Sequence, residues 1–388
     1  MIPCEACRNL IARRSYRKLL RSLEFMSDYT VRQEKLRRAL AGQHASALLV
    51  TRFTNVTYLT GFSGDDSFLL VTPDNVVLIT DFRFETQLED ECPGLDLYVR
   101  KQGEQMFQAI AKVVKAAGLS QLAIDAESMT VGLREQIAKE LPKVSMPSTS
   151  GLIELLREVK DKEEIGQIRR AAAIAEKALA IVRHTMLPER SERQVAAELD
   201  YQMRQLGAKG SAFETIIATG ARAALPHARP GEQTIGSGEF TLVDWGATAG
   251  MYRSDLTRLV VTSKISPKLK RVYGVVLEAQ RQAIAAIRPG VPACDVDRTA
   301  REVISQAGLG RYFGHSLGHG IGLDIHEGPR LIKTNKRPLK PGNVVTVEPG
   351  IYLAGWGGVR IEDDVLVTRH GCEVLTRFPK ELEESVVA

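Results

Sequence analysis

The sequence of 388 residues contains few cysteines, no long apolar run and little net charge of either sign. Its longest apolar stretches are short, such as 68–71, whereas a membrane span needs about 18 consecutive apolar residues, so we expect no membrane partner. The 52 Lys and Arg and 47 Asp and Glu leave a net charge of +5. Residues 1–26 supply most of this excess, so the rest of the chain is nearly neutral and a nucleic-acid partner is not expected.

The cysteines are odd in number and scattered, at Cys4, Cys7, Cys92, Cys294 and Cys372. This pattern does not form a disulfide framework and favours a reducing compartment, so we expect a cytoplasmic protein. The first two form a C-x-x-C pair, but no second pair follows at the spacing of a zinc site. Residues 1–25 lack the apolar core of a secretory signal, and we interpret them as a basic N-terminal extension. We expect that Met26 is the true start of the protein. An Arg-rich transit peptide is the alternative.

Residues 26–150 alternate helical and strand patterns, which predicts an N-terminal domain of mixed α/β type. The helical patterns lie near 31–40 and 106–117, and the apolar strand runs lie at 47–50, 68–72, 76–80 and 121–125. The second and third of these runs are separated by Pro73-Asp74-Asn75, which predicts a hairpin. Pro147–Gly151 is the most linker-like segment, so we place the start of a second domain, 151–388, at this point.

The second domain is predicted to be α+β, with helices covering one side of an antiparallel sheet. Apolar residues spaced three and four apart predict a helix over 163–182. Ser191 and Gln194 form a capping box that predicts the start of a further helix, and two more helical patterns span 269–287 and 295–307. The intervening segments are short β-branched runs divided by Gly and Pro, which is typical of strands.

Acidic side chains interrupt strongly apolar strand runs at two pairs of positions. Asp244 and Asp255 are separated by a glycine-containing turn, so a hairpin would bring both carboxylates to one face of the sheet. Glu348 and Glu362 flank a Gly-rich loop in the same way, which suggests two pseudo-symmetric halves of one site. Adjacent buried carboxylates are unfavourable unless a positive group compensates them.

A third segment, 313–327, contains three of the seven histidines, His315, His319 and His326. Its glycines allow the backbone to approach a site closely. Four carboxylates and an imidazole form an oxygen and nitrogen donor set that suits Mn²⁺, Co²⁺, Fe²⁺ or Zn²⁺. Four acids exceed the need of one divalent ion, whereas two ions would neutralise them, generate hydroxide and polarise a carbonyl. The pattern therefore predicts metal-assisted hydrolysis.

These segments resemble the metallopeptidase group of Xaa-Pro aminopeptidases, prolidases and methionine aminopeptidases. The resemblance is carried by the motifs V-D-W-G, S-D-L-T-R, G-H-G-I-G-L-D-I-H-E, V-E-P-G-I-Y and R-I-E-D-D. The stretches at 55–64 and 80–83 resemble the creatinase-type N-terminal domain of the proline-specific branch. The resemblance implies an α+β chain of two domains, a mixed α/β creatinase-like domain and a pita-bread catalytic domain with a curved antiparallel sheet covered by helices.

The resemblance also implies the ligands of two divalent metal ions. The five expected ligands are Asp244, Asp255, His319, Glu348 and Glu362. Asp255 and Glu362 would bridge the ions, Asp244 would hold one ion, and the remaining two ligands would hold the other. Mn²⁺ is our first choice of metal, with Co²⁺ and Zn²⁺ as alternatives.

Further catalytic roles follow from the same resemblance. Glu348 is the expected general acid/base. The expected contacts to substrate, or to its tetrahedral intermediate, are His227, His315 and His326, because an imidazole can donate to a developing oxyanion. Arg360 is expected to orient Glu362 or to contact substrate.

Our leading functional hypothesis is an Xaa-Pro aminopeptidase, which cleaves before a proline at the second position of a peptide. A prolidase, which accepts only dipeptides, is the alternative, because Arg330 lies where some prolidases carry a carboxylate-binding arginine. The competing interpretation of Arg330 is a surface residue. A metal-free creatinase-like hydrolase and a non-catalytic binding module are distant alternatives, since no ligand is missing. Relatives commonly dimerise, so the resemblance implies a homodimer.

Overall fold

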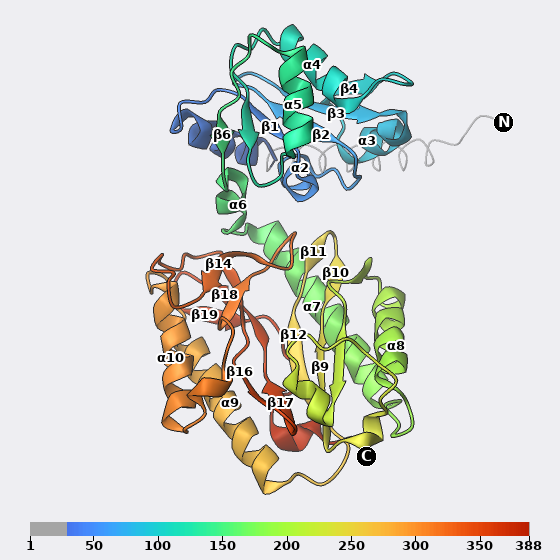
Figure 1. The fold of residues 1–388 in the computed structure, drawn as a ribbon, viewed down its shortest axis with the longest axis vertical. Helices are drawn as coiled ribbons and strands as arrows, with labels where there is room; N and C mark the ends of the chain where they lie inside the picture. The colour runs from blue at the N-terminus through green and yellow to red at the C-terminus, as the bar shows by residue number, and fades with distance from the viewer. Residues whose placement is uncertain (1–28, 388) are drawn as a thin grey trace, which may run out of the picture. The chain divides into compact units, whose positions relative to one another are not determined.

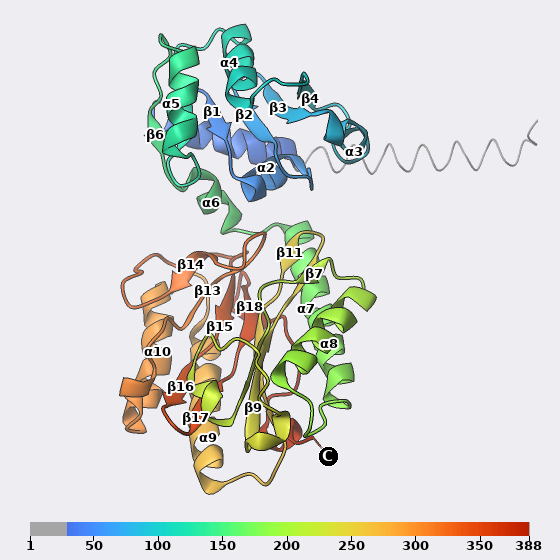
Figure 2. The same ribbon diagram turned by 45° about the vertical axis from the view of Figure 1, so that its right-hand side comes forward.

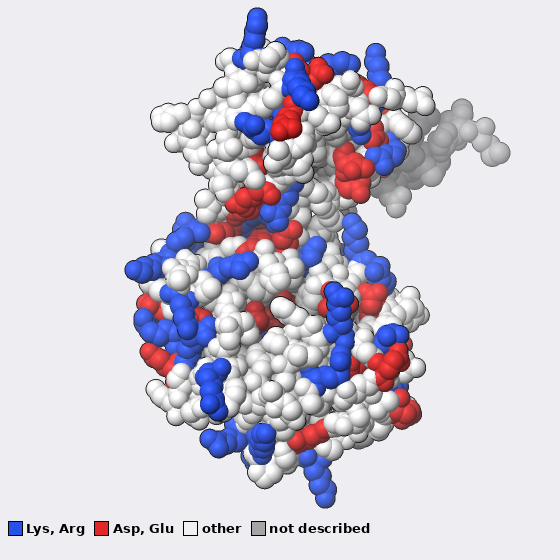
Figure 3. Space-filling view, in the orientation of Figure 1, with Lys and Arg blue, Asp and Glu red and all other residues white. Residues whose placement is uncertain are grey.

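The computed structural model describes residues 29–387, and the chain divides into two compact units between Leu156 and Arg157. The basic extension, Met26 and the first two cysteines lie outside the described residues. Within the described part, no helix is long and apolar enough to cross a membrane. On the face drawn in Figure 3, basic and acidic side chains are interspersed, without one continuous basic patch.

The N-terminal unit is built on a six-stranded mixed sheet with the order β4-β3-β2-β1-β5-β6 (Figure 1). Its strands are β1 Leu48–Val50, β2 Phe68–Val71, β3 Val76–Asp81, β4 Asp96–Arg100, β5 Ala123–Asp125 and β6 Ser148–Thr149. The expected hairpin is confirmed, because β2 pairs antiparallel with β3 and the turn closes with a bond from Thr72 N to Asn75 O of 2.8 Å. β1 pairs antiparallel with β2 and parallel with β5, so the sheet contains both kinds of pairing.

Helices cover this sheet through their apolar residues. Residues 29–41 are helical, and the other helices of the unit are α2 Phe53–Thr60, α3 Glu85–Glu91, α4 Met106–Ala116, α5 Val131–Glu140 and α6 Leu152–Arg157, the last of which crosses the division between the units. A short 3₁₀ turn, η1, spans Phe82–Phe84. Ile110 and Val114 of α4 pack with Ile137 of α5 and with Leu49 and Leu70 of the sheet.

The segment Pro147–Gly151, which we interpreted as a linker, contains a strand. Ser148 and Thr149 form β6, which pairs parallel with β5 at the edge of the sheet. The Pro, Ser and Gly of this segment suit an edge strand as well as a linker, because an edge strand pairs on one side only. Composition alone therefore did not distinguish the two.

The C-terminal unit contains four long helices, two of which begin with a capping box. The helices are α7 Lys162–Arg183, α8 Glu192–Gln205, α9 Pro267–Ala286 and α10 Ala293–Gln306. Ser191 is the N-cap of α8 and exchanges bonds with Gln194, as predicted, and Asp161 caps α7 in the same way. Four 3₁₀ turns complete the helical elements, η2 Gly220–Ala224, η3 Ile235–Ser237, η4 Gly310–Tyr312 and η5 Leu382–Ser385.

The strands of this unit form sheets that are antiparallel throughout. The first half contains β7 Gly210–Ser211, β8 Ile216–Thr219, β9 Phe240–Trp245, β10 Ala247–Ala249, β11 Tyr252–Arg253 and β12 Leu256–Val261. The second half contains β13 Gly318–Gly320, β14 Glu327–Leu331, β15 Val344–Val347, β16 Gly350–Leu353, β17 Gly357–Arg360, β18 Asp363–Val367 and β19 Cys372–Val374. The main sheets have the orders β12-β9-β8 and β14-β13-β15-β18-β19, and a bridge between Thr257 and Glu362 links them.

Each half of the unit has its own pair of helices, as Figures 1 and 2 show. Val243 and Trp245 of β9 pack with α7 and α8, so Asp244 between them faces the other side of the strand. Val365 and Val367 of β18 pack with α9 and α10. By the same alternation, residue 362, just before β18, faces away from these helices. The two halves therefore present their acidic residues on faces that the helices leave free.

Candidate metal centre

Asp244 and Asp255 lie on neighbouring strands of the first half. Asp244 on β9 is opposite Thr257 on β12, which places Asp255, just before β12, diagonally across from it. Gly246 makes this approach possible, because a Cβ atom at this position would lie 1.9 Å from Ser254 O. The predicted hairpin therefore forms with a glycine where the two strands approach most closely.

Glu348 and Glu362 occupy equivalent places in the second half. Val347 is opposite Asp363 in one ladder and Gly350 is opposite Arg360 in the next, so the two glutamates face each other between the ladders. The backbone N–H of Glu362 donates to Thr257 O at 3.2 Å, which joins this hairpin to the first.

His319 lies in β13, between two glycines that hold the strand close to its neighbours. A Cβ atom on Gly318 would lie 2.0 Å from Thr346 O, and one on Gly320 would lie 2.0 Å from Gly328 O. The imidazole Nδ1 is 3.1 Å from the carbonyl oxygen of Gly320, and burial lowers the pKa of His319 to about 3. The neutral ring therefore donates through Nδ1 and turns the lone pair of Nε2 toward the acids.

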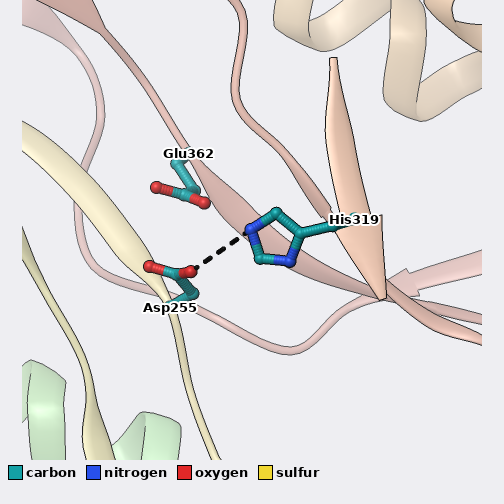
Figure 4. Close-up of side chains that lie close together, drawn as sticks. All are labelled: Asp255, His319 and Glu362. Carbon is teal, nitrogen blue, oxygen red and sulfur yellow. Dashed lines mark ion pairs between the residues drawn. The ribbon is translucent and has the colours of Figure 1, made fainter. Parts of the chain in front are cut away.

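The three elements converge on one point, which Figure 4 shows. Ligand atoms of Asp255, His319 and Glu362 all lie within 4.8 Å of one another, and all three residues are buried. His319 Nε2 is 3.6 Å from Asp255 Oδ2 and 3.4 Å from Glu348 Oε1. Thr257 Oγ1 donates to Glu362 Oε2 at 2.6 Å and so orients this carboxylate. The convergence of acids from both hairpins with one imidazole is therefore observed.

The carboxyl groups of the centre have raised pKa values because they are buried together. Burial and the neighbouring Glu362 hold the pKa of Asp255 well above its usual range, and burial and Glu348 do the same for Glu362. Burial raises the pKa of Glu348 to about 8. Within residues 29–387, no Lys or Arg forms an ion pair with any of these three acids. These three carboxyl groups are therefore held together without a directly paired Lys or Arg.

Asp244 differs from the other three acids because it contacts Arg360. Burial raises its pKa, while the guanidinium opposes this shift. Arg360 Nη2 donates to Asp244 Oδ2, but Oδ1 of the same carboxylate is buried without a hydrogen-bond partner among the described residues. Asp244 thus has one buried oxygen without a partner in the described part of the chain.

Arg360 lies in the hydrogen-bond network beside Glu362, where we expected it to orient this carboxylate or to contact substrate. It is 3% exposed, and its Nε donates to Thr257 Oγ1 at 3.0 Å, the hydroxyl that in turn binds Glu362. Its Nη1 donates to Tyr352 Oη at 2.7 Å. Its nitrogens are thus bound within the protein, and any influence on Glu362 passes through Thr257.

The three other histidines occupy different surroundings. His315 is bound at both ring nitrogens, to Ser316 O at 2.8 Å and to Tyr352 Oη at 3.0 Å, and burial lowers its pKa to about 4. His326 is exposed and its ring packs edge-on against His319, with centroids 4.3 Å apart. His227 is exposed, and its charge acts on Asp244 and His326. All three therefore lie around the centre, but only His315 is held by hydrogen bonds from the described residues.

Sequence reasoning missed Thr257 and Tyr352, which support the centre, and left open whether Asp364 supports it or is only solvated. Tyr352 joins His315 to Arg360, and Thr257 joins Arg360 to Glu362. Asp364 is fully buried and accepts from the backbone N–H of Asp255 at 3.1 Å. Only Asp364 gave a signal, because it is an acid next to the apolar run 365–367.

Comparison with known proteins identifies the family of this arrangement. The model of metallopeptidase family M24 matches residues 166–369, the stretch that contains every residue of the centre. The chain belongs to metallopeptidase family M24. The model of the creatinase/prolidase N-terminal domain matches residues 32–159. The resemblance and the α+β fold with a pita-bread catalytic domain are therefore confirmed.

Individual relatives of this M24 peptidase match along nearly their whole length. The Xaa-Pro dipeptidase of Pyrococcus furiosus is 37% identical over 353 residues, which cover 90% of this chain and 99% of the relative. The structure of the Xaa-Pro dipeptidase from Bacillus anthracis has a TM-score of 0.88 at 38% identity, covering 92% of this chain and 99% of the other. The X-Pro aminopeptidase from Thermotoga maritima has a TM-score of 0.82 at 36% identity, covering 87% and 96%.

Membership of this family makes the chain a metal-dependent hydrolase, and the centre fits divalent ions. The buried Asp255 and Glu362 and the neighbouring Glu348 have no Lys or Arg partner among the described residues, Oδ1 of Asp244 is unbonded, and a neutral imidazole directs its lone pair toward the acids. Oxygen and nitrogen donors without a thiolate suit hard to borderline divalent ions. The donor set alone does not select one metal among them.

Proposed function

We propose that this peptidase is an Xaa-Pro dipeptidase, which hydrolyses the bond before proline in dipeptides. The observation that carries the proposal is its similarity to Xaa-Pro dipeptidases over 90% or more of this chain, in a sequence that retains the complete set of four acids and His319. The comparisons thus favour the prolidase alternative over our leading hypothesis of an aminopeptidase.

We assign the metal ligands of two ions as the sequence predicted. Asp255 and Glu362 lie at the meeting point of the two hairpins, where they would serve as the ligands shared by both ions. Asp244, with one free oxygen, belongs to one ion, and His319 and Glu348 belong to the other. A bound pair of divalent ions lowers the pKa of water and polarises the scissile carbonyl.

The side chains around the centre have separate proposed roles in accepting a proton from water and in donating hydrogen bonds to the oxyanion. Glu348 Oε1 accepts from Thr346 Oγ1 at 3.2 Å, so its other oxygen, Oε2, is the one assigned to take a proton from water. His326 and His227 are exposed beside the centre, and each can donate an N–H to the oxyanion of the tetrahedral intermediate. His315 is committed to Ser316 and Tyr352, so we assign it to holding Tyr352 rather than to binding substrate.

Arg330 supports the limit to dipeptides. It is exposed on β14, and its charge lowers the pKa values of His326 and His319, after the larger effect of burial in each case. In the described part of the chain no carboxylate forms an ion pair with it, so its guanidinium is free to bind the C-terminal carboxylate of a dipeptide. A longer peptide would place an amide instead of this carboxylate beside Arg330.

A second candidate function is the Xaa-Pro aminopeptidase activity of our first hypothesis. It is supported by the likeness to the X-Pro aminopeptidase of Thermotoga maritima, at 36% identity. The two functions share the centre and differ in what lies beyond the proline, so the length of the substrate separates them.

The test compares Ala-Pro with Ala-Pro-Ala, using protein reconstituted with Mn²⁺, Co²⁺ or Zn²⁺ in turn. We expect efficient hydrolysis of Ala-Pro and at least about tenfold lower kcat/KM for the tripeptide. We expect Arg330→Met to raise KM for Ala-Pro while leaving the tripeptide unaffected. Equal cleavage of both peptides by the native enzyme would establish the aminopeptidase, and cleavage of neither would reject both functions.

The remaining features of the proposal follow from composition and donor chemistry. Mn²⁺ is the proposed ion because four of five ligands are carboxylates. A cytoplasmic location follows from the scattered, unpaired pattern of cysteines. A homodimer follows from the family resemblance, and size-exclusion chromatography with light scattering measures it directly.

A further inference from the structure

The loop that carries His326 ends at a buried glutamate. His326 is the last residue of the loop and is exposed, whereas the side chain of the next residue, Glu327, is only 6% exposed at the start of β14. The two neighbours therefore point to different surroundings, His326 toward His319 and Glu327 into the protein.

Glu327 is held by two cations from one short segment of the chain. Arg157 Nη2 donates to its Oε1, and Lys160 Nζ lies 3.1 Å from its Oε2. The side chains of both cations are at most 2% exposed. The backbone N–H of Asp324 adds a third bond, 2.8 Å long, to Oε1. Charge-assisted bonds to both oxygens give a carboxylate a defined orientation, so the start of β14 is held in place.

The same segment also holds the turn before His326. Arg157 Nη2 donates to Asp324 Oδ2 at 2.8 Å, so one guanidinium binds residues on both sides of the histidine. Two glycines fit this close packing. A Cβ atom on Gly322 would lie 2.8 Å from the Glu327 carboxylate, and one on Gly328 would lie 2.1 Å from the carboxylate of Glu158.

We propose that Glu327, through Arg157 and Lys160, is a positioning residue that holds the imidazole of His326 against His319. Replacing a whole buried ion pair by apolar residues of the same size is often neutral or stabilising, so the stability of the fold does not by itself require two cations on one acid. What they supply is a fixed geometry for the loop. This inference rests on the proposed function, in which His326 donates to the oxyanion.

The test is a double-mutant cycle that combines Glu327→Gln with His326→Ala. We expect Glu327→Gln to lower kcat for Ala-Pro about tenfold while KM changes less than about twofold, because a misplaced donor weakens only the transition state. In the His326→Ala background the same substitution should have no further effect on kcat. Mn²⁺ binding, measured by calorimetry, should be the same in all four proteins.

A control variant separates positioning from general stability. Arg337 binds Glu158 of the same segment, with bonds of 2.9 and 2.6 Å, but contacts neither Glu327 nor His326. Arg337→Gln should lower the melting temperature and leave kcat within about twofold of the native value. If Glu327→Gln does not fold, Lys160→Met replaces it in the cycle. We again expect it to lower kcat in the native background and to leave kcat unchanged in the His326→Ala background.

The possible outcomes distinguish the inference from the function on which it rests. Losses in kcat that multiply in the double variant, or a loss of Mn²⁺ binding in Glu327→Gln, would overturn the positioning role. An unchanged kcat in His326→Ala, with normal cleavage of Ala-Pro by the native enzyme, would overturn both the role of His326 and the inference. Failure of the native enzyme to cleave any Xaa-Pro peptide would reject the proposed function itself.

Discussion

Glu362 and Asp363 are adjacent in the chain and both are buried, yet the pKa values of their carboxyl groups move in opposite directions. Burial and the acids around it hold the pKa of Glu362 well above its usual range. Burial alone would also raise the pKa of Asp363, but Arg258 and Lys380 outweigh it and lower the value. Alternation of side chains at the start of β18 turns the two residues to opposite faces.

The two carboxylates differ in whether the chain itself compensates their charge. Asp363 accepts four hydrogen bonds of 2.6 to 2.8 Å, from Arg258, Gln280, Thr376 and Lys380. Among residues 29–387, the carboxylate of Glu362 accepts a hydrogen bond from Thr257 Oγ1 alone. Fully paired acids such as Asp363 belong to the framework, whereas an unpaired buried acid marks a place where a cation from outside completes the structure.

The strongest test of this contrast is Glu362→Gln. We expect this variant to lose divalent-ion binding and hydrolysis of Ala-Pro by more than about a hundredfold, because even groups that only support metal ligands cost 10–100-fold. In the presence of EDTA, however, its melting temperature should exceed that of the native protein, because one of several repelling acids has been removed. Calorimetry with Mn²⁺ and thermal unfolding in EDTA measure the two effects.

The added metal provides the control for this prediction. Saturating Mn²⁺ should raise the melting temperature of the native protein, because a ligand that binds only the folded state stabilises it, and should leave Glu362→Gln unchanged. A metal-free variant less stable than the metal-free native protein would show that Glu362 is a framework residue like Asp363.

Asp363→Ala should have the opposite effect on stability from Glu362→Gln without metal. We expect it to lower the free energy of unfolding by about 3–5 kcal/mol, because it leaves the buried Arg258 and the partly exposed Lys380 without their carboxylate. Both tryptophans of the chain, Trp245 and Trp356, lie in the C-terminal unit, so urea unfolding followed by their fluorescence reports on this unit.

An exposed ion pair serves as the matched control for Asp363→Ala. Glu232 pairs with Arg193 at 2.6 Å, but its side chain is 73% exposed. Glu232→Gln should therefore change the free energy of unfolding by less than about 0.5 kcal/mol. Equal effects of the two substitutions would mean that the buried network around Asp363 does not stabilise the unit.

The acids of the centre could be predicted because they violate a local pattern. Asp244 interrupts an apolar strand. Alternation of side chains places it on the other face of the strand from Val243 and Trp245, which pack on the helices. Glu362 follows the same rule at β18. The α+β fold and most helices were predictable for a related reason, since apolar spacing and the capping box at Ser191 are local signals.

The supporting contacts could not be predicted because they depend on distant parts of the chain. Arg360 lies two residues before Glu362 in the chain, but it binds Asp244, 116 residues away, and reaches Glu362 through Thr257. Arg157 and Glu327 are 170 residues apart, and neither position breaks a pattern in its own segment. Such pairs are set by how the sheets meet, which local periodicity does not encode.

The smallest expected effect concerns the pH dependence of Glu327, a second acid that is paired with cations. Burial would raise the pKa of Glu327, but Lys160 and Arg157 lower it to about 2 from an ordinary value of 4.5. A carboxyl group whose pKa is lower in the folded state stabilises that state at a pH above its ordinary pKa. This contribution is lost as the pH falls through the pKa of the folded state. At pH values above 4.5, the shift contributes about 3 kcal/mol to the free energy of unfolding.

The expected result is that native protein and Glu327→Gln differ most at about pH 5 and that roughly half of the difference disappears by about pH 3. Urea unfolding followed by tryptophan fluorescence at both pH values measures it, and subtraction of the two proteins removes the titration of the groups they share. A difference that stays constant between the two pH values would show that Glu327 is not selectively ionised in the folded state. Glu327 would then resemble the acids of the metal centre rather than Asp363, and the contrast between paired and unpaired acids would fail at this position.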